Sequence, residues 1–230
     1  MVEVNKRDLL ISMIIKMIAI VVSIYGMTRS FSGIMFFTYF TNLSNIFVDV
    51  VLFIFFMYDI LLWKQKEINI KQMMYIVKFM ATISITLTFF VYMLLLAPTY
   101  ETGFIGAYLN NGAGSLCVHL INPLLAIIDF LVFDYHYQSE RSHVLYAVIP
   151  PLVYVGFVIV LGQVFQIRWN DVMLAPYNFL NYGAKTGWFG FNLSLFGPTT
   201  LGIGSFYMII ILLIIFIGLG TLFLKVKRKV

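Results

Sequence analysis

Charged side chains are scarce in this sequence. Only 11% of its 230 residues are Asp, Glu, Lys or Arg, whereas 61% are hydrophobic. An ordinary globular domain carries about a quarter charged residues, so this chain cannot solvate the surface of a water-soluble domain. The net charge of +5 does not indicate nucleic-acid binding either, because the Lys and Arg residues stand at the ends of apolar blocks, where they mark one side of a membrane.

Cysteine is almost absent as well. Cys117 is the single cysteine and there are only three histidines, which excludes an intramolecular disulfide and leaves no spacing typical of a zinc site. We therefore predict neither a bound metal ion nor a cofactor, and no nucleic-acid partner.

What the sequence does contain is a series of long apolar blocks. A helix needs about 20 predominantly apolar residues to cross a bilayer. Lipid offers no hydrogen-bond partners, and a helix satisfies all its backbone groups within one segment. The pattern predicts an all-α, polytopic membrane protein whose residues 1–230 form a single six-helix transmembrane domain, with helices near 9–27, 36–62, 72–96, 114–133, 144–165 and 201–224.

The basic residues predict the orientation of these helices. If six helices alternate in direction, Arg29, Arg168 and Lys185 fall on one side, and the other side receives Lys6, Arg7, Lys64, Lys66, Lys71, Arg141, Lys225, Lys227, Arg228 and Lys229. Because cytoplasmic loops carry an excess of Lys and Arg, we expect both termini in the cytoplasm.

Four of the ionisable residues inside the predicted helices are assigned similar depths near the inner side: Lys16, Asp49, Lys78 and Asp129. Two lysines and two aspartates form a neutral set, which favours a structural network that pins helices together. A proton or ion pathway is the alternative, because intramembrane charges often mark one.

An outer layer pairs a hydroxyl with an imidazole. Counted at helical rise, Thr41 and His119 each lie roughly 8 Å below the outer boundary, and the amides nearby are Asn42, Asn45 and Asn122. Histidine is the usual base for a hydroxyl nucleophile, and amides can hold an oxyanion. The structural alternative is that Thr41 bonds to its own helix while His119 joins two helices.

Three local patterns carry a family resemblance: residues 39–45 (YFTNLSN), 115–123 (SLCVHLINP) leading to Asp129-Phe130, and 175–180 (APYNFL). In this order they resemble the androgen-induced and androgen-dependent TFPI-regulating transmembrane proteins, and more closely the bacterial six-helix relatives of that family. The resemblance covers most of the chain and implies a bacterial plasma membrane.

The resemblance implies a hydrolase of fatty acid esters of hydroxy fatty acids, with a catalytic threonine in the second helix and a catalytic histidine in the fourth. By position these are Thr41 and His119. The expected partner is a membrane lipid or fatty acyl ester, and the oligomeric state stays open. A proton- or ion-coupled transporter and a non-catalytic lipid-binding protein are the alternatives.

Overall fold

The computed structural model of this chain describes residues 5–66, 68–99 and 101–228. It is helical, and among the described residues extended backbone pairs only in isolated bridges. Six helical segments are long and apolar enough to cross a membrane, which confirms the all-α, six-helix prediction: Lys6–Ser30, Phe40–Trp63, Gln72–Leu94, Gly112–Phe133, Arg141–Gln163 and Ser205–Lys227. Their ends differ from the predicted ones by a few residues, because hydropathy does not mark the first and last turns of a helix.

Shorter helical turns extend or connect the main helices. In chain order the elements are α1 (Lys6–Ser30), η1 (Gly33–Thr38), α2 (Phe40–Trp63), α3 (Gln72–Val91), η2 (Tyr92–Leu96), η3 (Ala97–Thr99), α4 (Gly103–Leu116), η4 (Cys117–Ile121), α5 (Asn122–Ile128), η5 (Asp129–Phe133), η6 (Arg141–Val148), α6 (Ile149–Gln163), η7 (Asn178–Leu180), η8 (Leu193–Leu195) and α7 (Ser205–Lys227). Of these, η2, η4 and η5 are π-helical turns.

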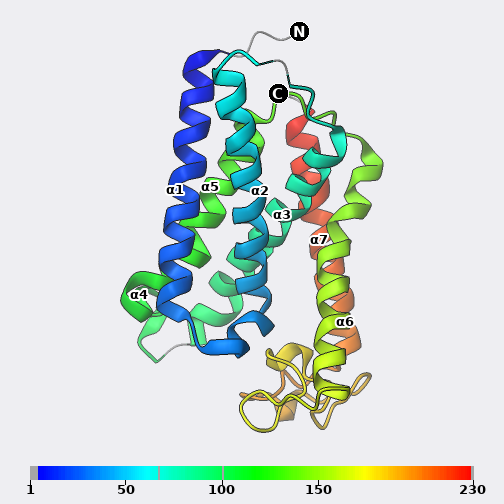
Figure 1. The fold of residues 1–230 in the computed structure, drawn as a ribbon. Helices are drawn as coiled ribbons and strands as arrows, with labels where there is room; N and C mark the ends of the chain where they lie inside the picture. The colour runs from blue at the N-terminus through cyan, green and yellow to red at the C-terminus, as the bar shows by residue number, and fades with distance from the viewer. Residues whose placement is uncertain (1–4, 67, 100, 229–230) are drawn as a thin grey trace. The chain divides into compact units, whose positions relative to one another are not determined.

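The chain forms two compact units. Unit 1 comprises Met1–Ala147 with Thr221–Val230, and unit 2 comprises Val148–Gly220. All the residues that we predicted as functional fall in unit 1. Within it, α1 packs against α2 and against the helix formed by α5 and its flanking π turns, and α3 packs against α2 and α5 (Figure 1).

One end of unit 1 holds both described chain ends. Lys6 at the start of α1, Lys64 at the end of α2 and Arg228 after α7 lie there, and we call it the basic end (Figure 1). The guanidinium of Arg228 donates to the Ser139 carbonyl at 3.3 Å, which ties the last turn of the chain to the loop before η6.

The fourth span begins at a break in the backbone. Gly112 and Ala113 have φ values of 62° and 64°, a left-handed conformation that interrupts α4. The Tyr25 hydroxyl donates to the Gly112 carbonyl at 2.9 Å and so stabilises the break from α1. Residues 103–111 therefore form a short helical segment before the span, where the sequence predicted only a connection.

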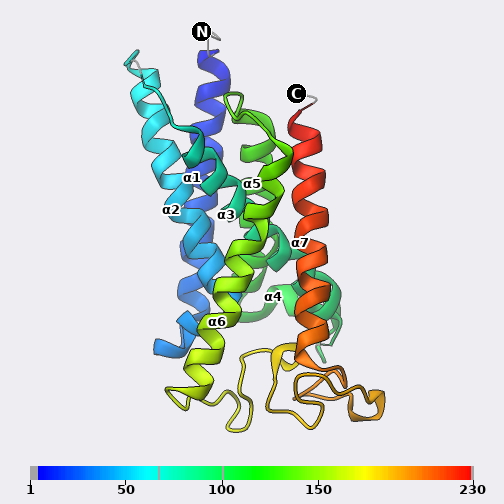
Figure 2. The same cartoon turned by 90° about the vertical axis from the view of Figure 1, so that its right-hand side faces the viewer.

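Unit 2 contains α6, the first part of α7 and the long connection between them, in which helix is limited to η7 and η8 (Figure 2). Asn181 organises this connection: its side chain accepts from the Leu174 amide at 3.0 Å and donates to the Thr199 carbonyl at 2.8 Å. Trp169, 1% exposed, packs inside it.

Candidate functional site

The first part of the site is an amide that joins four segments. Asn45 lies in the second turn of α2 and is fully buried. Its Nδ2 donates to the Thr41 carbonyl at 2.8 Å and to the Val118 carbonyl at 3.3 Å. Its Oδ1 accepts from Asn122 Nδ2 at 2.8 Å and from the Ser23 hydroxyl at 3.3 Å. Asn45 thus connects α1, α2, η4 and α5, and every hydrogen-bonding position of its side chain is used.

This arrangement revises the predicted oxyanion donors. Both N–H groups of Asn45 are engaged, and Asn122 Nδ2 donates to Asn45 and, at 3.4 Å, to Asp49 Oδ1. These two amides are structural and have no N–H left for an oxyanion. Asn42 is half-buried and its Nδ2 donates to the Phe36 carbonyl at 2.8 Å, which occupies one of its two N–H groups. Of the three predicted amides, Asn42 is the remaining candidate.

His119 lies in the middle of the π-helical turn η4. The backbone N–H of Asn122 closes the turn by donating to the Cys117 carbonyl, five residues back. Such turns often occur at functional positions. The His119 ring stacks on Tyr92 with centroids 3.6 Å apart and planes at 8°. The Tyr92 hydroxyl in turn donates to the Ala107 carbonyl at 2.8 Å. Aromatic stacking and this hydrogen bond together fix the plane of the imidazole.

The structure brings the segments of Thr41 and His119 together without joining their side chains. The carbonyls of Thr41 and Val118 share one amide donor, Asn45. His119 Nδ1 is buried and has no hydrogen-bond partner among the described residues, so the Thr41 hydroxyl is not bonded to it. Thr41 itself is half-buried in the first turn of α2.

The second part of the site is a row of alternating charges near the basic end. Lys16 Nζ lies 2.8 Å from Asp59 Oδ2 and 2.8 Å from Asp129 Oδ1. Lys78 Nζ lies 2.6 Å from Asp129 Oδ2 and 2.7 Å from Asp134 Oδ1. We call Asp59, Lys16, Asp129, Lys78 and Asp134, in this order, the ion-pair chain. It connects α1, α2, α3, η5 and the residue that follows η5.

The structure thus brings together three of the four residues of the predicted network and places Asp49 elsewhere. Lys16, Lys78 and Asp129 are joined, but Asp49 lies ten residues before Asp59 on α2, about 15 Å farther from the basic end. It contacts Asn122 instead. Its other oxygen, Oδ2, is buried without a hydrogen-bond partner among the described residues.

Sequence reasoning missed Asp59, Asp134 and Ser12. The Ser12 hydroxyl contacts Lys16 and donates to Asp59 at 3.1 Å. Asp59 stands one turn before the end of α2, where a carboxylate usually faces solvent. In an ordinary helix Asp134 would point about 140° away from Asp129. The π-helical turn η5 widens the helix and brings Asp134 beneath Asp129 instead. The available signal was that Asp59 and Asp134 are acids at the ends of apolar blocks, on the side from which Lys16 and Lys78 enter the membrane.

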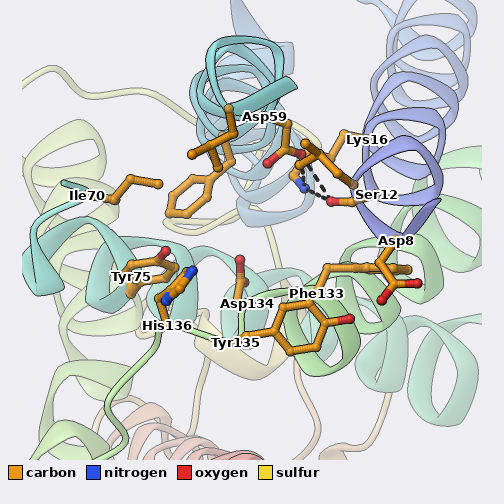
Figure 3. A pocket seen from close by; sticks show the side chains of 13 residues that line it. Asp8, Ser12, Lys16, Asp59, Ile70, Tyr75, Phe133, Asp134, Tyr135 and His136 are labelled. Atoms are coloured by element: carbon orange, nitrogen blue, oxygen red, sulfur yellow. Dashed lines mark hydrogen bonds and ion pairs between the residues drawn. The ribbon is translucent and has the colours of Figure 1, made fainter. Parts of the chain in front are cut away.

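A cavity borders the ion-pair chain on the side of the basic end (Figure 3). Its volume is about 40 Å³, and its lining includes Ser12, Lys16, Asp59, Tyr75 and Asp134. A single water needs roughly 10–15 Å³ on this scale, so a few waters fit. A larger pocket of about 410 Å³ adjoins it, and the two share Leu62, Ile70, Tyr75 and His136 as lining residues.

Within residues 5–66, 68–99 and 101–228, no group of three or more His, Cys, Asp or Glu side chains is arranged to hold a metal ion. The comparisons with known proteins add no assignment: no family model matches the sequence, and neither a curated protein nor a solved structure matches it.

Proposed function

We propose that this protein is an intramembrane hydrolase of lipid esters, with Thr41 as the nucleophile and His119 as the general base. The observation that carries the proposal is the Asn45 bridge, because one buried side chain holds the carbonyls of Thr41 and Val118 at 2.8 and 3.3 Å from the same nitrogen. Because His119 follows Val118 in the sequence, Asn45 holds the first turn of α2, which carries Thr41, next to the π-helical turn that carries His119.

The His119 ring offers a nitrogen that can act as a base. A neutral imidazole needs one nitrogen free to accept a proton, and Nδ1 has no hydrogen-bond partner among the described side chains and backbone groups. The stack on Tyr92 fixes the ring plane. The distance to the Thr41 hydroxyl has to close when a substrate binds, as catalytic hydrogen bonds commonly do on substrate binding.

His119 takes up a proton and gives it back twice in the proposed reaction, the second time to the Thr41 oxygen. His119 takes the Thr41 hydroxyl proton, the alkoxide attacks the ester carbonyl, and the unused N–H of Asn42 is the proposed donor to the oxyanion. His119 then protonates the leaving alcohol, which leaves an acyl-threonine. Water, deprotonated by His119, hydrolyses the acyl-threonine and restores the hydroxyl.

The surroundings of Thr41 favour a lipid over a soluble ester. The segment before α2 exposes Phe31, Ile34 and Phe37, with 59%, 80% and 40% of their surface accessible. In a membrane protein such side chains contact acyl chains. An ester whose chains lie among them presents its carbonyl near the start of α2, in line with the fatty acyl ester substrate that the sequence resemblance implies.

The test is covalent labelling of the purified protein with a fluorophosphonate probe. We expect the wild type to be labelled and to hydrolyse a long-chain fluorogenic ester, and Thr41→Ala and His119→Gln to lose both. Thr86→Ala is the matched control: it removes a buried hydroxyl that donates to the Thr82 carbonyl at 2.6 Å on α3, and should keep labelling. Labelling that persists in folded Thr41→Ala would falsify the nucleophile; retained lipid binding with no turnover in the wild type would favour a non-catalytic lipid-binding protein.

A further inference from the structure

The ion-pair chain has a carboxylate at each end and too few lysines for its carboxylates. Asp129, in the middle, contacts a lysine through each of its oxygens. Asp59 contacts only Lys16 and Asp134 contacts only Lys78 among the lysines of the ion-pair chain, and both lysines also contact Asp129. The two end carboxylates are therefore less compensated than the central one. Within the chain the formal charge is −1 when every member is ionised.

The same two ends reach the cavity. Asp59 and Asp134 both line it, whereas Asp129 and Lys78 do not. Asp134 is 5% exposed, and its Oδ2 has no hydrogen-bond partner among the described residues. Figure 3 shows the Asp134 carboxylate pointing into the space between Tyr75, Tyr135 and the pair of Asp59 with Lys16. A buried, unpartnered carboxylate oxygen beside a polar cavity requires either water or a proton.

The cavity adjoins a larger pocket on the side of the basic end. This pocket, of about 410 Å³, lies between the loop after α2 and the loop after η5. Gln72, the first residue of α3, holds the second loop: its Nε2 donates to the His136 carbonyl at 2.8 Å, and its Oε1 accepts from the Gln138 backbone N–H at 3.1 Å. The lining residues that the two spaces share make this pocket the entry for water in the proposal below.

We propose that Asp134 and Asp59 form a proton-binding site that exchanges one proton with water from the basic end of unit 1. A hydronium ion in the cavity gives its proton to Asp134 Oδ2 and leaves as water, while Lys78 keeps its pair with Asp129. Water in the cavity connects the two end carboxylates and lets them share the proton. This site is independent of Thr41 and His119.

Burial and a neighbouring carboxylate favour proton uptake by Asp134, and the nearby ammonium groups oppose it. Burial raises the pKa of Asp134, which the Lys78 ammonium opposes and the Asp129 carboxylate reinforces. The remaining titratable groups around Asp134 or in the same cavity are Lys16 and Asp8 on α1, Asp59 on α2, Tyr75 on α3, Tyr135 and His136 in the same loop and Lys227 on α7.

Lys227 does not replace the missing cation. Its ammonium donates to the Leu131 carbonyl at 3.2 Å and lies 5.6 Å from the centre of the Phe130 ring. None of the ion pairs between described residues includes it. The lysines also explain why a proton is preferred to a metal ion: the Lys16 and Lys78 ammonium groups repel a second cation but leave a carboxylate free to be neutralised.

Infrared titration of the purified protein in detergent tests the site. Protonated buried carboxyls give a carbonyl stretching band that carboxylates lack. In the wild type we expect this band to grow by one carboxyl's intensity as the pH falls through the midpoint of Asp134, and Asp134→Asn should lose this component. Asp8→Asn, which changes a half-buried acid lining the same cavity, and Asp49→Asn, which changes a buried acid outside the ion-pair chain, should keep it.

Three further measurements decide the remaining outcomes. If Asp134→Asn does not fold, Asp134→Glu keeps the charge and should shift the frequency or midpoint of the component; an unchanged component overturns the proposal. In sealed vesicles the component should follow the pH at the basic end alone. A midpoint that moves when sodium replaces potassium also overturns the proposal and indicates a metal-cation site.

Discussion

Asp129 and Asp49 are both buried carboxylates, but they differ in their partners. Asp129 contacts Lys16 and Lys78 at 2.8 and 2.6 Å, whereas Asp49 forms no ion pair with a described residue and accepts a hydrogen bond from Asn122 at 3.4 Å. Asp129→Asn leaves two buried ammonium groups with one carboxylate each. Since removing one partner of a buried pair costs about 3–5 kcal/mol, we expect a large fall in the unfolding midpoint of the purified protein.

The matched substitution Asp49→Asn supplies the comparison. It removes a charge whose Oδ2 lacks a hydrogen-bond partner among the described residues, and it keeps an acceptor for Asn122. We expect an unchanged or higher midpoint in thermal unfolding. Equal losses for Asp129→Asn and Asp49→Asn would show that Asp49 belongs to the same energetic network after all.

The charged residues also show which side-chain contacts could be predicted from the sequence. Lys16, Lys78 and Asp129 stand in apolar blocks, so their burial and pairing could be predicted from hydropathy and depth. Asp134 could not, because its place beneath Asp129 depends on a π-helical turn that has no hydrophobic period of its own. Depth predicted that the Thr41 hydroxyl pairs with the His119 imidazole. The structure links their segments through Asn45 but does not bond the Thr41 hydroxyl to His119 Nδ1, because side-chain orientation does not follow from depth alone.

At the scale of elements, the contact between α1 and η4 depends on a glycine. A Cβ added at Gly26 would lie 2.7 Å from Val118 Cγ1 and 2.8 Å from the Gly114 carbonyl oxygen. Gly26→Ala therefore forces α1 away from the turn that carries His119. Overpacking of this kind costs about 1–3 kcal/mol, and we expect a lower unfolding midpoint together with weaker fluorophosphonate labelling.

Gly156→Ala is the control for this contact. Gly156 lies in α6, and a Cβ there meets no atom within 4 Å. Because alanine is the better helix former by about 1 kcal/mol, we expect this substitution to be neutral or slightly stabilising and to leave labelling intact. Similar losses in both variants would mean that glycine flexibility, and not the close approach at Gly26, is what matters.

Helix positions were the most predictable elements, because a bilayer requires long apolar blocks and the chain supplies six of them. The connections were less predictable. The break at Gly112 and Ala113 places a helix over residues 103–111 that hydropathy reads as a Gly-rich connection, and it is stabilised by Tyr25 from a distant part of the chain. Nonlocal hydrogen bonds of this kind leave no periodic trace in the sequence.

At the scale of the whole molecule, the number of spans and the basic residues together predict the topology. If the six candidate spans alternate in direction, Lys6 and Lys227 lie on the same side of the bilayer. Most Lys and Arg residues flank the spans at that side, with Arg29, Arg168 and Lys185 in the opposite connections. We propose that the basic end faces the cytoplasm of a bacterial cell, because positively charged flanks are retained there. This orientation would supply the proposed proton site from the cytoplasm and open the Thr41 layer to the outer leaflet.

Reporter fusions measure this orientation. Green fluorescent protein fused after the C-terminus should fluoresce, and alkaline phosphatase fused there should be inactive, because the first reporter folds in the cytoplasm and the second needs export. Fusions within the connection between α6 and α7, for instance after Gly187, should give the opposite pair of results. An active phosphatase at the C-terminus would invert the molecule and place the proton site on the outer face. Because that inversion leaves the ion-pair chain and the Asn45 bridge unchanged, infrared titration and probe labelling of the purified protein would still report on both sites independently of orientation.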